Sequence, residues 1–560
     1  MKQIKGKPLP IGVTATETEV NFSIAVPDGK ECSLLLYHPG RKAPCASFEM
    51  KECVGEVRYL ALRDMGKRNY EYNYMIDGEI TVDPYAKALA GRSRWGRGAK
   101  VSEHEVRGIF RFDEYDWEGD VFPEIPLHKA VAYAIHVRGL TKDSSSKARQ
   151  KGTFEGVIEK IPYFKELGVN QLHCMPVYEF EECGVRTNYW GYGPAYCFAP
   201  KSAYSAGKDA VRSLKDMVKA CHREGIEVIL EMPFDGSASR QMMAECLRHY
   251  MMEYHIDGFI LNPSVAPMEE YAQDPILKKT KILRHDTGFQ DVMRRFLKGD
   301  EGMVHDVIYW LRRHSKDGGT FNSITGHTGF TLNDLVSYES KHNEGNGENN
   351  QDGPNYNYSW NCGAEGPSRK REISALRNRQ MRNAFLLLLL SQGTPCLLAG
   401  DEFYNSQKGN NNVYCQDNPV GWVNWGRLDK EPELAAFVKR LIELRKSYPA
   451  FCPEREMLGM DQAGWGVPDG ESAWRVPGEV SSRWLGVYYS GQSEDREDCF
   501  VAYNMHWLTH GFALPALKKG RKWYVLASTD GILEAPESVE NQKCIEVKAN
   551  RGFGRKVSKI

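Results

Sequence analysis

The sequence has 560 residues, 41% of them hydrophobic, which is too long for one compact core and predicts several domains. Lys and Arg number 73 and Asp and Glu 74, so no net charge favours binding to nucleic acid or to an anionic membrane. The longest apolar run, residues 384–390, is far shorter than the roughly 20 residues that span a bilayer, and the N-terminus lacks a secretion signal. We expect a cytoplasmic protein.

The first 125 residues contain short segments of alternating polarity, separated by Gly, Pro and Asp turns. Residues 20–25 and 32–37 are examples. This pattern is typical of a small β-sandwich, which we predict for residues 1–125.

Between residues 126 and 450 the pattern changes to strands that alternate with helices. The sequence predicts strands near 170–177, 226–231, 258, 282, 323–325 and 395–399, and helices near 157–167, 213–224, 240–254 and 372–390. Repeated alternation over this length favours a (β/α)8 TIM barrel, whose functional residues follow the C-terminal ends of the strands.

Short, aromatic-rich segments return after residue 450. Residues 484–489 and 522–526 are predicted strands, which suggests a second β-sandwich over residues 451–560. The fourteen cysteines are scattered along the chain with no Cys-x-x-Cys pair, so we predict that they are small buried hydrophobes. Neither a metal site nor a cofactor is predicted.

Several motifs in the barrel region resemble the glycogen debranching enzyme and isoamylase branch of the α-amylase superfamily. They lie at residues 133–142, 188–192, 334–337, 342–344, 357–361, 392–395, 399–403 and 409–418. The resemblance covers nearly the whole chain and implies an α-amylase-type barrel between two β-sandwiches, of which the first resembles a carbohydrate-binding module. It also implies an α-glucan ligand, such as glycogen, starch or a maltooligosaccharide.

The family's nucleophile position is altered in this chain. The segment 255–264 resembles the strand in which the family reads Asp-Gly-Phe-Arg-Phe-Asp, and here Ile260 replaces the Arg and Asn262 the nucleophilic Asp. An amide is a poor nucleophile and carries no charge to stabilise an oxocarbenium-like transition state.

Three further family positions differ as well. His285 occupies the position of the acid, Thr328 follows His327 where the family has its third carboxylate, and Gly236 replaces a sugar-binding His. Retaining hydrolysis needs a carboxylate nucleophile and a second carboxyl group about 5 to 5.5 Å away. The loops after Gly236 and His285 are also short, which predicts an open cleft.

From these substitutions we predict that the chain is not an enzyme but a catalytically inactive homologue that binds α-glucan or forms a hetero-oligomer with an active glucan enzyme. Two alternatives remain. The chain could be an active α-1,6-glucosidase or another glycoside hydrolase with relocated carboxylates, or a regulatory protein that does not bind glucan. The acidic residues near predicted strand ends are Glu231, Asp235, Asp286, Asp401 and Glu402.

The residues that could still bind substrate are mostly aromatic. Tyr189, Trp190 and Tyr192 could stack on a sugar ring or serve only in packing, and His327 is the retained polar residue of its motif.

Overall fold

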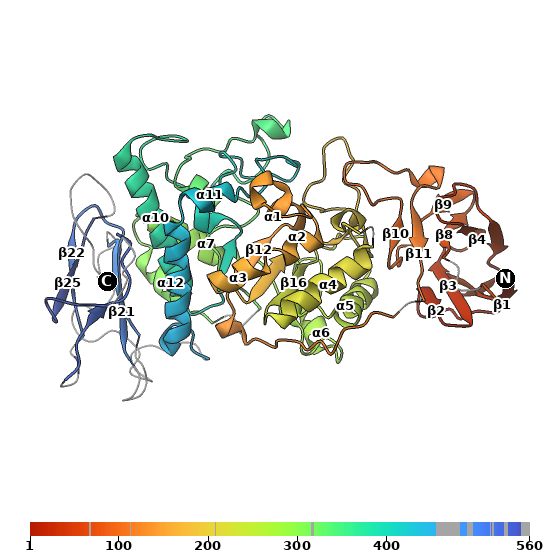
Figure 1. Cartoon of the computed structure of the whole chain (residues 1–560), viewed down its shortest axis with the longest axis horizontal. Helices are drawn as coiled ribbons and strands as arrows, with labels where there is room; N and C mark the ends of the chain where they lie inside the picture. Colours follow the sequence, from red (N-terminus) through yellow and green to blue (C-terminus); the bar gives the residue numbers. More distant parts are fainter. Residues whose placement is uncertain are drawn as a thin grey trace.

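The computed structural model describes residues 1–65, 69–112, 114–207, 209–314, 319–454, 482–489, 497–515, 517, 520–530 and 536–549. Figure 1 shows these residues as an elongated molecule with three parts in sequence order. An N-terminal β region lies at one end, a mixed α/β body in the middle, and a second β region at the other end.

Two antiparallel sheets form the N-terminal region. The sheets have the orders β1-β7-β3-β2, with β6 beside β7, and β10-β11-β8-β4-β5, with β9 beside β8. Their inner faces share a core of apolar residues that includes Phe22, Leu34 and Tyr72. The strands are β1 Lys2–Ile4, β2 Gly12–Ala15, β3 Glu19–Ala25, β4 Cys32–Tyr37, β5 Ala46–Glu49, β6 Glu52–Val54, β7 Val57–Arg63, β8 Glu71–Ile76, β9 Glu79–Thr81, β10 Leu89–Ala90 and β11 Arg107–Ile109.

A ring of parallel strands forms the centre of the molecule. Its sheet has the order β18-β17-β16-β13-β12-β19, and residues 320–322 close the ring through single bridges to Arg284 and Pro395. The strands are β12 Ala132–Ile135, β13 Gln171–Cys174, β16 Glu227–Glu231, β17 Gly258–Ile260, β18 Lys281–Leu283 and β19 Cys396–Leu398, and a hairpin of β14 Tyr178–Phe180 and β15 Ala195–Pro200 interrupts the ring sequence. The predicted barrel is confirmed.

Helices surround the ring. They are α1 Val137–Lys142, α2 Phe154–Ile158, α3 Ile161–Leu167, α4 Ala210–Arg223, α5 Arg240–Tyr254, α6 Met268–Gln273, α7 Thr287–Lys298, α8 Val304–Arg312, α9 Leu332–Leu335, α10 Arg371–Leu389, α11 Gly426–Lys430 and α12 Glu433–Ser447. Polar caps set several of their starts: Ser239 accepts a hydrogen bond from the Met242 amide at α5, and Asp286 accepts one from the Gly288 amide at α7.

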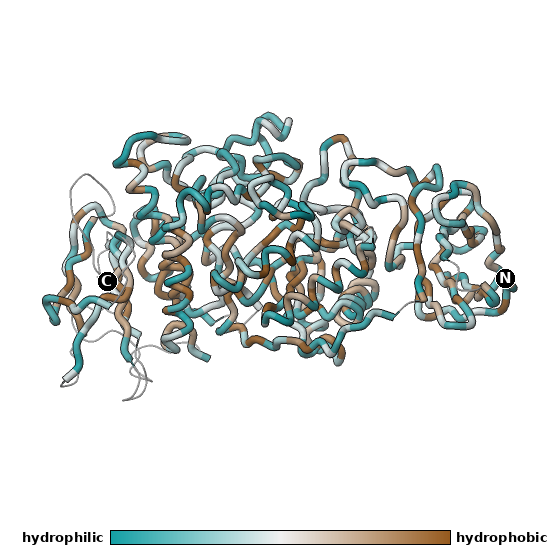
Figure 2. The backbone as a smooth tube through the Cα atoms, in the orientation of Figure 1, coloured by the Kyte–Doolittle hydropathy of each residue, from teal (hydrophilic) through white to brown (hydrophobic). Residues whose placement is uncertain are grey.

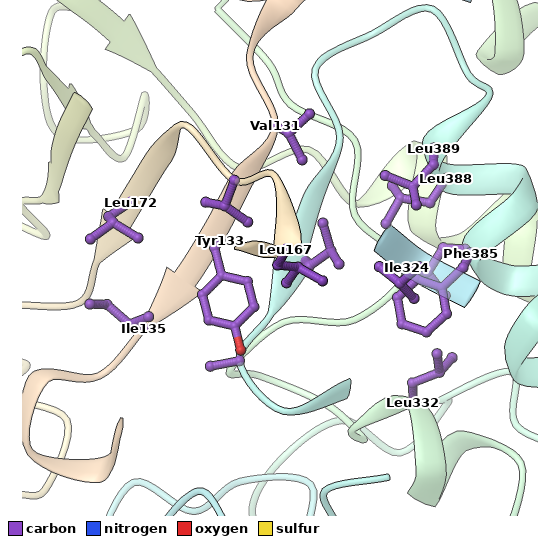
Figure 3. Packing of buried hydrophobic residues seen from close by; sticks show 14 of the residues in the cluster. Val131, Tyr133, Ile135, Leu167, Leu172, Ile324, Leu332, Phe385, Leu388 and Leu389 are labelled. Atoms are coloured by element: carbon purple, nitrogen blue, oxygen red, sulfur yellow. The ribbon is translucent and has the colours of Figure 1, made fainter. Parts of the chain in front are cut away.

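Apolar side chains of strands and helices pack together to hold the barrel. Figure 3 shows Tyr133 of β12 beside Leu167 of α3, and Ile135 of β12 near Leu172 of β13; Val131, just before β12, belongs to the same cluster. These side chains are almost completely buried, and their removal from water is the main stabilising contribution to the barrel. Figure 2 shows the corresponding hydrophobic colouring of the central strands and of α12.

The C-terminal region pairs β20 Trp484–Tyr489 with β21 Cys499–Asn504, β22 His510–Ala513 with β25 Cys544–Val547, and β23 Tyr524–Val525 with β24 Glu537–Ser538. The predicted strands at 484–489 and 522–526 fall on β20 and β23, whereas 455–481 lie outside the described residues. The fold class, a (β/α)8 barrel with flanking β domains, is confirmed. The domain boundaries at 125 and 450 stay predictions. None of the helices among the described residues has the length and apolar character needed to cross a membrane.

Candidate functional site

Glu231 is the last residue of β16 and lies at the C-terminal end of the barrel strands. Its side chain is only 10% exposed. One carboxylate oxygen accepts hydrogen bonds from the Tyr192 hydroxyl at 2.8 Å and from His285 Nε2 at 3.3 Å. A buried charge requires such partners to offset its lost hydration.

The strand register explains why His285 reaches this carboxylate. Glu231 is level with Ile260 on β17, which is level with Leu283 on β18. Successive side chains of a strand point to opposite sides, so His285, two residues beyond Leu283, lies on the same side as Glu231. His327 joins from the loop after the segment 320–322, and its Nε2 lies 2.7 Å from the Tyr192 hydroxyl.

The cluster fixes the charge states of its members. Burial raises the pKa of Glu231, but His327, His285 and the Tyr192 hydrogen bond outweigh that effect and lower it to about 2. Burial lowers the pKa of His285, yet the hydrogen bond and charge of Glu231 outweigh burial and raise it above its ordinary value. For His327 the effect of burial is larger than that of the Glu231 charge, so the pKa of this imidazole is lowered. Glu231 is therefore ionised at neutral pH, and its charge favours the protonated form of the neighbouring His285 imidazole.

A cavity of about 80 Å³ opens beside these groups, and Glu231 is the sole carboxylate among the described residues that line it. Ile260 and Phe321 give it an apolar wall. An open groove of about 520 Å³ shares the lining residue Trp190 with this cavity, and its lining residues are Arg186, Thr187, Asn188, Trp190, Tyr192, Glu348, Asp352, Asn412 and Tyr414. The cavity has room for a few water molecules only, and the groove has room for sugar residues.

The altered family positions predicted from the sequence do not all face the cavity. His285 lines the cavity, and Ile260 is buried in its wall. Asn262 is exposed and turns away into a local loop, where its side-chain oxygen accepts a hydrogen bond from the Ser264 amide at 3.0 Å. Thr328 and Gly236 are exposed and are not among the cavity-lining residues.

The predicted aromatic residues differ in accessibility. Tyr189 is 1% exposed and donates a hydrogen bond to the Gly421 carbonyl, so packing accounts for it. Trp190 is 5% exposed and its ring packs edge-on against His327. Tyr192 is partly exposed and lines the groove. Sugar binding by these residues and by His327 stays a prediction.

The other acidic candidates have local structural roles. Asp235 accepts a hydrogen bond from the Ser237 amide at 2.9 Å, and Asp286 caps α7 and pairs with Arg313. Asp401 and Glu402 are fully buried away from the cavity lining.

The joining of Glu231, His285, His327 and Tyr192 into one cluster was not predicted from the sequence. A signal was present, because polar residues follow the strands that begin near 227 and 281, and parallel strand ends meet at one edge of a barrel. The strands expected near 226–231 and 282 fall on β16 and β18, whereas the strand expected at 323–325 is replaced by single bridges at Thr320 and Asn322. The direction of the side chains within the loops was not available from the pattern.

The barrel, the flanking sheets and a polar cluster at the strand ends define an α-amylase-type protein. Residues 141–272 match the family model described as "Alpha amylase, catalytic domain". The chain is 28% identical to isoamylase 1, chloroplastic, of Oryza sativa subsp. japonica, over 94% of this chain and 82% of the relative. It is 30% identical to the glycogen debranching enzyme of Erwinia tasmaniensis, over 84% of this chain and 87% of that enzyme. The chain belongs to the isoamylase and glycogen debranching enzyme family.

Solved structures support the fold. Pullulanase from Bacillus acidopullulyticus matches with a TM-score of 0.75 and 19% identity, over 97% of this chain and 74% of that one. Pullulanase from Paenibacillus barengoltzii, solved in complex with maltohexaose and α-cyclodextrin, matches with a TM-score of 0.73 and 20% identity, over 97% of this chain and 96% of that one.

These comparisons contradict the prediction that the chain is not an enzyme. Its relatives over most of its length are named as debranching enzymes and isoamylases, which points to an enzyme. The prediction treated each family position separately, and Asn262, His285 and Thr328 do lack the expected carboxylates. However, an ionised carboxylate on a neighbouring strand end, Glu231, faces the same edge of the barrel, so the lost positions alone do not exclude chemistry there.

Proposed function

We propose that the chain is an α-glucan hydrolase of the debranching type whose chemistry is centred on Glu231. The observation that carries the proposal is that Glu231 is the carboxylate facing the cavity at the C-terminal strand ends, among the described residues of a chain from this family. In barrels of this kind the functional groups lie at that edge.

The charge of Glu231 suits the reaction. Cleavage of a glycoside passes through an oxocarbenium-like transition state, which a nearby carboxylate stabilises by its charge or by direct attack. His285 supplies an N–H that can protonate the leaving oxygen. The 3.3 Å separation of these two groups is shorter than the about 5 to 5.5 Å of a retaining carboxyl pair, so a sugar must separate them as it enters.

The groove beside the cavity supports an α-glucan substrate. Its lining combines the aromatic rings of Trp190, Tyr192 and Tyr414 with the polar side chains of Asn188 and Asn412. Aromatic faces and amide groups together suit the apolar faces and hydroxyls of a glucose chain. One relative of known structure was solved with maltohexaose, which is consistent with such a ligand. A cytoplasmic location and an association with a second glucan enzyme stay predictions.

The test is the release of reducing ends from glycogen and pullulan, with linear amylose to report linkage preference. We expect turnover on the branched or α-1,6-linked substrates, and a loss on the order of a thousandfold in Glu231→Gln, which keeps the shape but removes the charge. Glu269→Gln, an exposed change on α6, is the matched control and should leave turnover unchanged. Folded wild-type protein without turnover on any of these glucans would overturn the proposal. Activity that persists in Glu231→Gln but is lost in Asp235→Asn would also overturn it, and would assign the catalytic carboxylate to Asp235.

A further inference from the structure

Glu231, His285 and His327 bring three potential metal-ligand atoms together at the mouth of the barrel. One atom from each side chain lies within 4.8 Å of the other two. We infer that these three side chains form a binding site for a divalent transition metal ion such as Zn²⁺. This inference goes beyond the proposed function, because it concerns binding of an ion and does not require turnover.

The spacing is close to that of a metal site. A tetrahedral ion with ligands at about 2.0 to 2.1 Å holds neighbouring ligand atoms about 3.3 Å apart. The separation of Glu231 and His285 Nε2 is 3.3 Å. His327 completes the set after a small side-chain rotation, since all three atoms already lie within 4.8 Å. Three protein ligands leave a fourth position of a tetrahedral ion open.

The donor atoms select the class of metal. Two imidazole nitrogens and one carboxylate oxygen suit Zn²⁺ and other first-row transition ions, whereas Mg²⁺ and Ca²⁺ prefer a shell made entirely of oxygen. No cysteine belongs to the cluster, so soft ions gain no thiolate ligand. We therefore expect Zn²⁺ or Co²⁺ to bind and Ca²⁺ not to bind.

The surroundings of the cluster support the geometry. The Tyr192 hydroxyl donates to the Glu231 carboxylate at 2.8 Å, which orients that ligand, and such outer contacts raise metal affinity. Phe321 packs edge-on against His285 with ring centroids 5.3 Å apart, which limits the rotation of this imidazole. The side chain of His285 is 49% exposed, so an ion can reach the site from solvent.

Metal binding would have a consequence for the reaction. An ion on these ligands occupies the carboxylate of Glu231 and the nitrogen of His285 that the reaction requires, so Zn²⁺ should inhibit turnover. This one expectation rests on the proposed function. The binding itself does not.

The experiment titrates Co²⁺ and Zn²⁺ into metal-free, untagged protein. Cys45 and Cys53, the two exposed thiols, are changed to Ser so that they do not bind the ions. We expect one Co²⁺ per chain with the visible absorption of a four- or five-coordinate ion, displaced by Zn²⁺ and not by Ca²⁺. His285→Ala and His327→Ala should each weaken binding about a hundredfold. His305→Ala, which removes an exposed imidazole from α8, should leave affinity unchanged.

The outcomes separate this inference from the proposed function. Failure to bind Co²⁺ and Zn²⁺ by folded protein, or binding that survives both His285→Ala and His327→Ala, would overturn the metal site. A thermal melt of each variant shows whether it is folded, and His285→Ala, at a half-exposed residue, is expected to remain so. Metal binding by a protein that hydrolyses no glucan would support the metal site and overturn the proposed function.

Discussion

Two sets of buried carboxylates lie at the ends of the barrel strands, and they differ in charge. Glu231 is the last residue of β16, and its partners lower its pKa to about 2. Asp401 and Glu402 follow β19, and burial raises the pKa of each to about 7 against the smaller effect of their hydrogen bonds. The same kind of side chain is therefore ionised at one strand end and largely protonated below pH 7 at another.

The partners explain this difference. Two imidazoles surround Glu231, whereas Asp401 and Glu402 are held by neutral groups. Asp401 accepts hydrogen bonds from the Thr325 hydroxyl and the Leu332 amide, and Glu402 accepts one from the Tyr133 hydroxyl at 2.7 Å. Hydroxyls and amides satisfy a buried carboxyl group but supply less charge compensation. The comparison assigns Glu231 to chemistry and the other two to structure.

After Glu231→Gln, the largest effect that tests this comparison is expected from His285→Ala. Without the imidazole, the cavity loses its proton donor beside Glu231, and we expect turnover on pullulan to fall about a hundredfold. Initial rates at saturating and limiting substrate would show whether the loss falls on kcat, as a chemical role requires. A loss confined to KM would contradict the role and leave His285 as a binding residue.

A smaller effect is expected from Tyr192→Phe. This change removes the hydroxyl that donates to Glu231 and contacts His327, and it keeps the ring at the edge of the groove. We expect a rate about tenfold lower, since one hydrogen bond to a charged group contributes about 1.5 to 3 kcal/mol. A loss of turnover greater than that caused by His285→Ala would mean that the hydroxyl itself takes part in the reaction.

The smallest effect on turnover is expected from Asp401→Asn, which should change it less than about twofold. Its effect should be on stability. A carboxyl group whose pKa is raised in the folded state stabilises the fold below its unfolded pKa and loses that contribution as the pH rises through about 7. Between pH 5 and 7, deprotonation of Asp401 makes the unfolding free energy of the wild type fall as the pH rises. In Asp401→Asn this slope should be less steep by up to ~1.4 kcal/mol per pH unit. Denaturant unfolding at several pH values measures this slope, and an unchanged slope would contradict the assignment.

The sequence predicted the fold well, because it depends on patterns that a linear chain carries. The helix predicted at 240–254 matches α5, Arg240–Tyr254, where the start is set by the Ser239 cap and the end by His255 in a left-handed conformation. The barrel strands were also predicted to within a few residues. Local capping and hydrophobic periodicity are sufficient for these elements.

The site was predictable only in part. Reading Asn262, His285 and Thr328 against the family identified the missing carboxylates, but it did not show that Asn262 turns out of the cavity while His285 points into it. The contact between His285 and Glu231 joins residues 54 positions apart, and it depends on the register of three strands. Such a contact becomes visible only when the strands are paired.

The central claim, that Glu231 is charged where Asp401 is not, can be tested by infrared difference spectroscopy of the metal-free protein at pH 5.5. A protonated carboxyl group has a carbonyl band that an ionised carboxylate lacks. Subtracting the spectrum of each variant from that of the wild type should reveal such a band for Asp401→Asn and none for Glu231→Gln. A protonated-carboxyl band that disappears in Glu231→Gln would contradict the account.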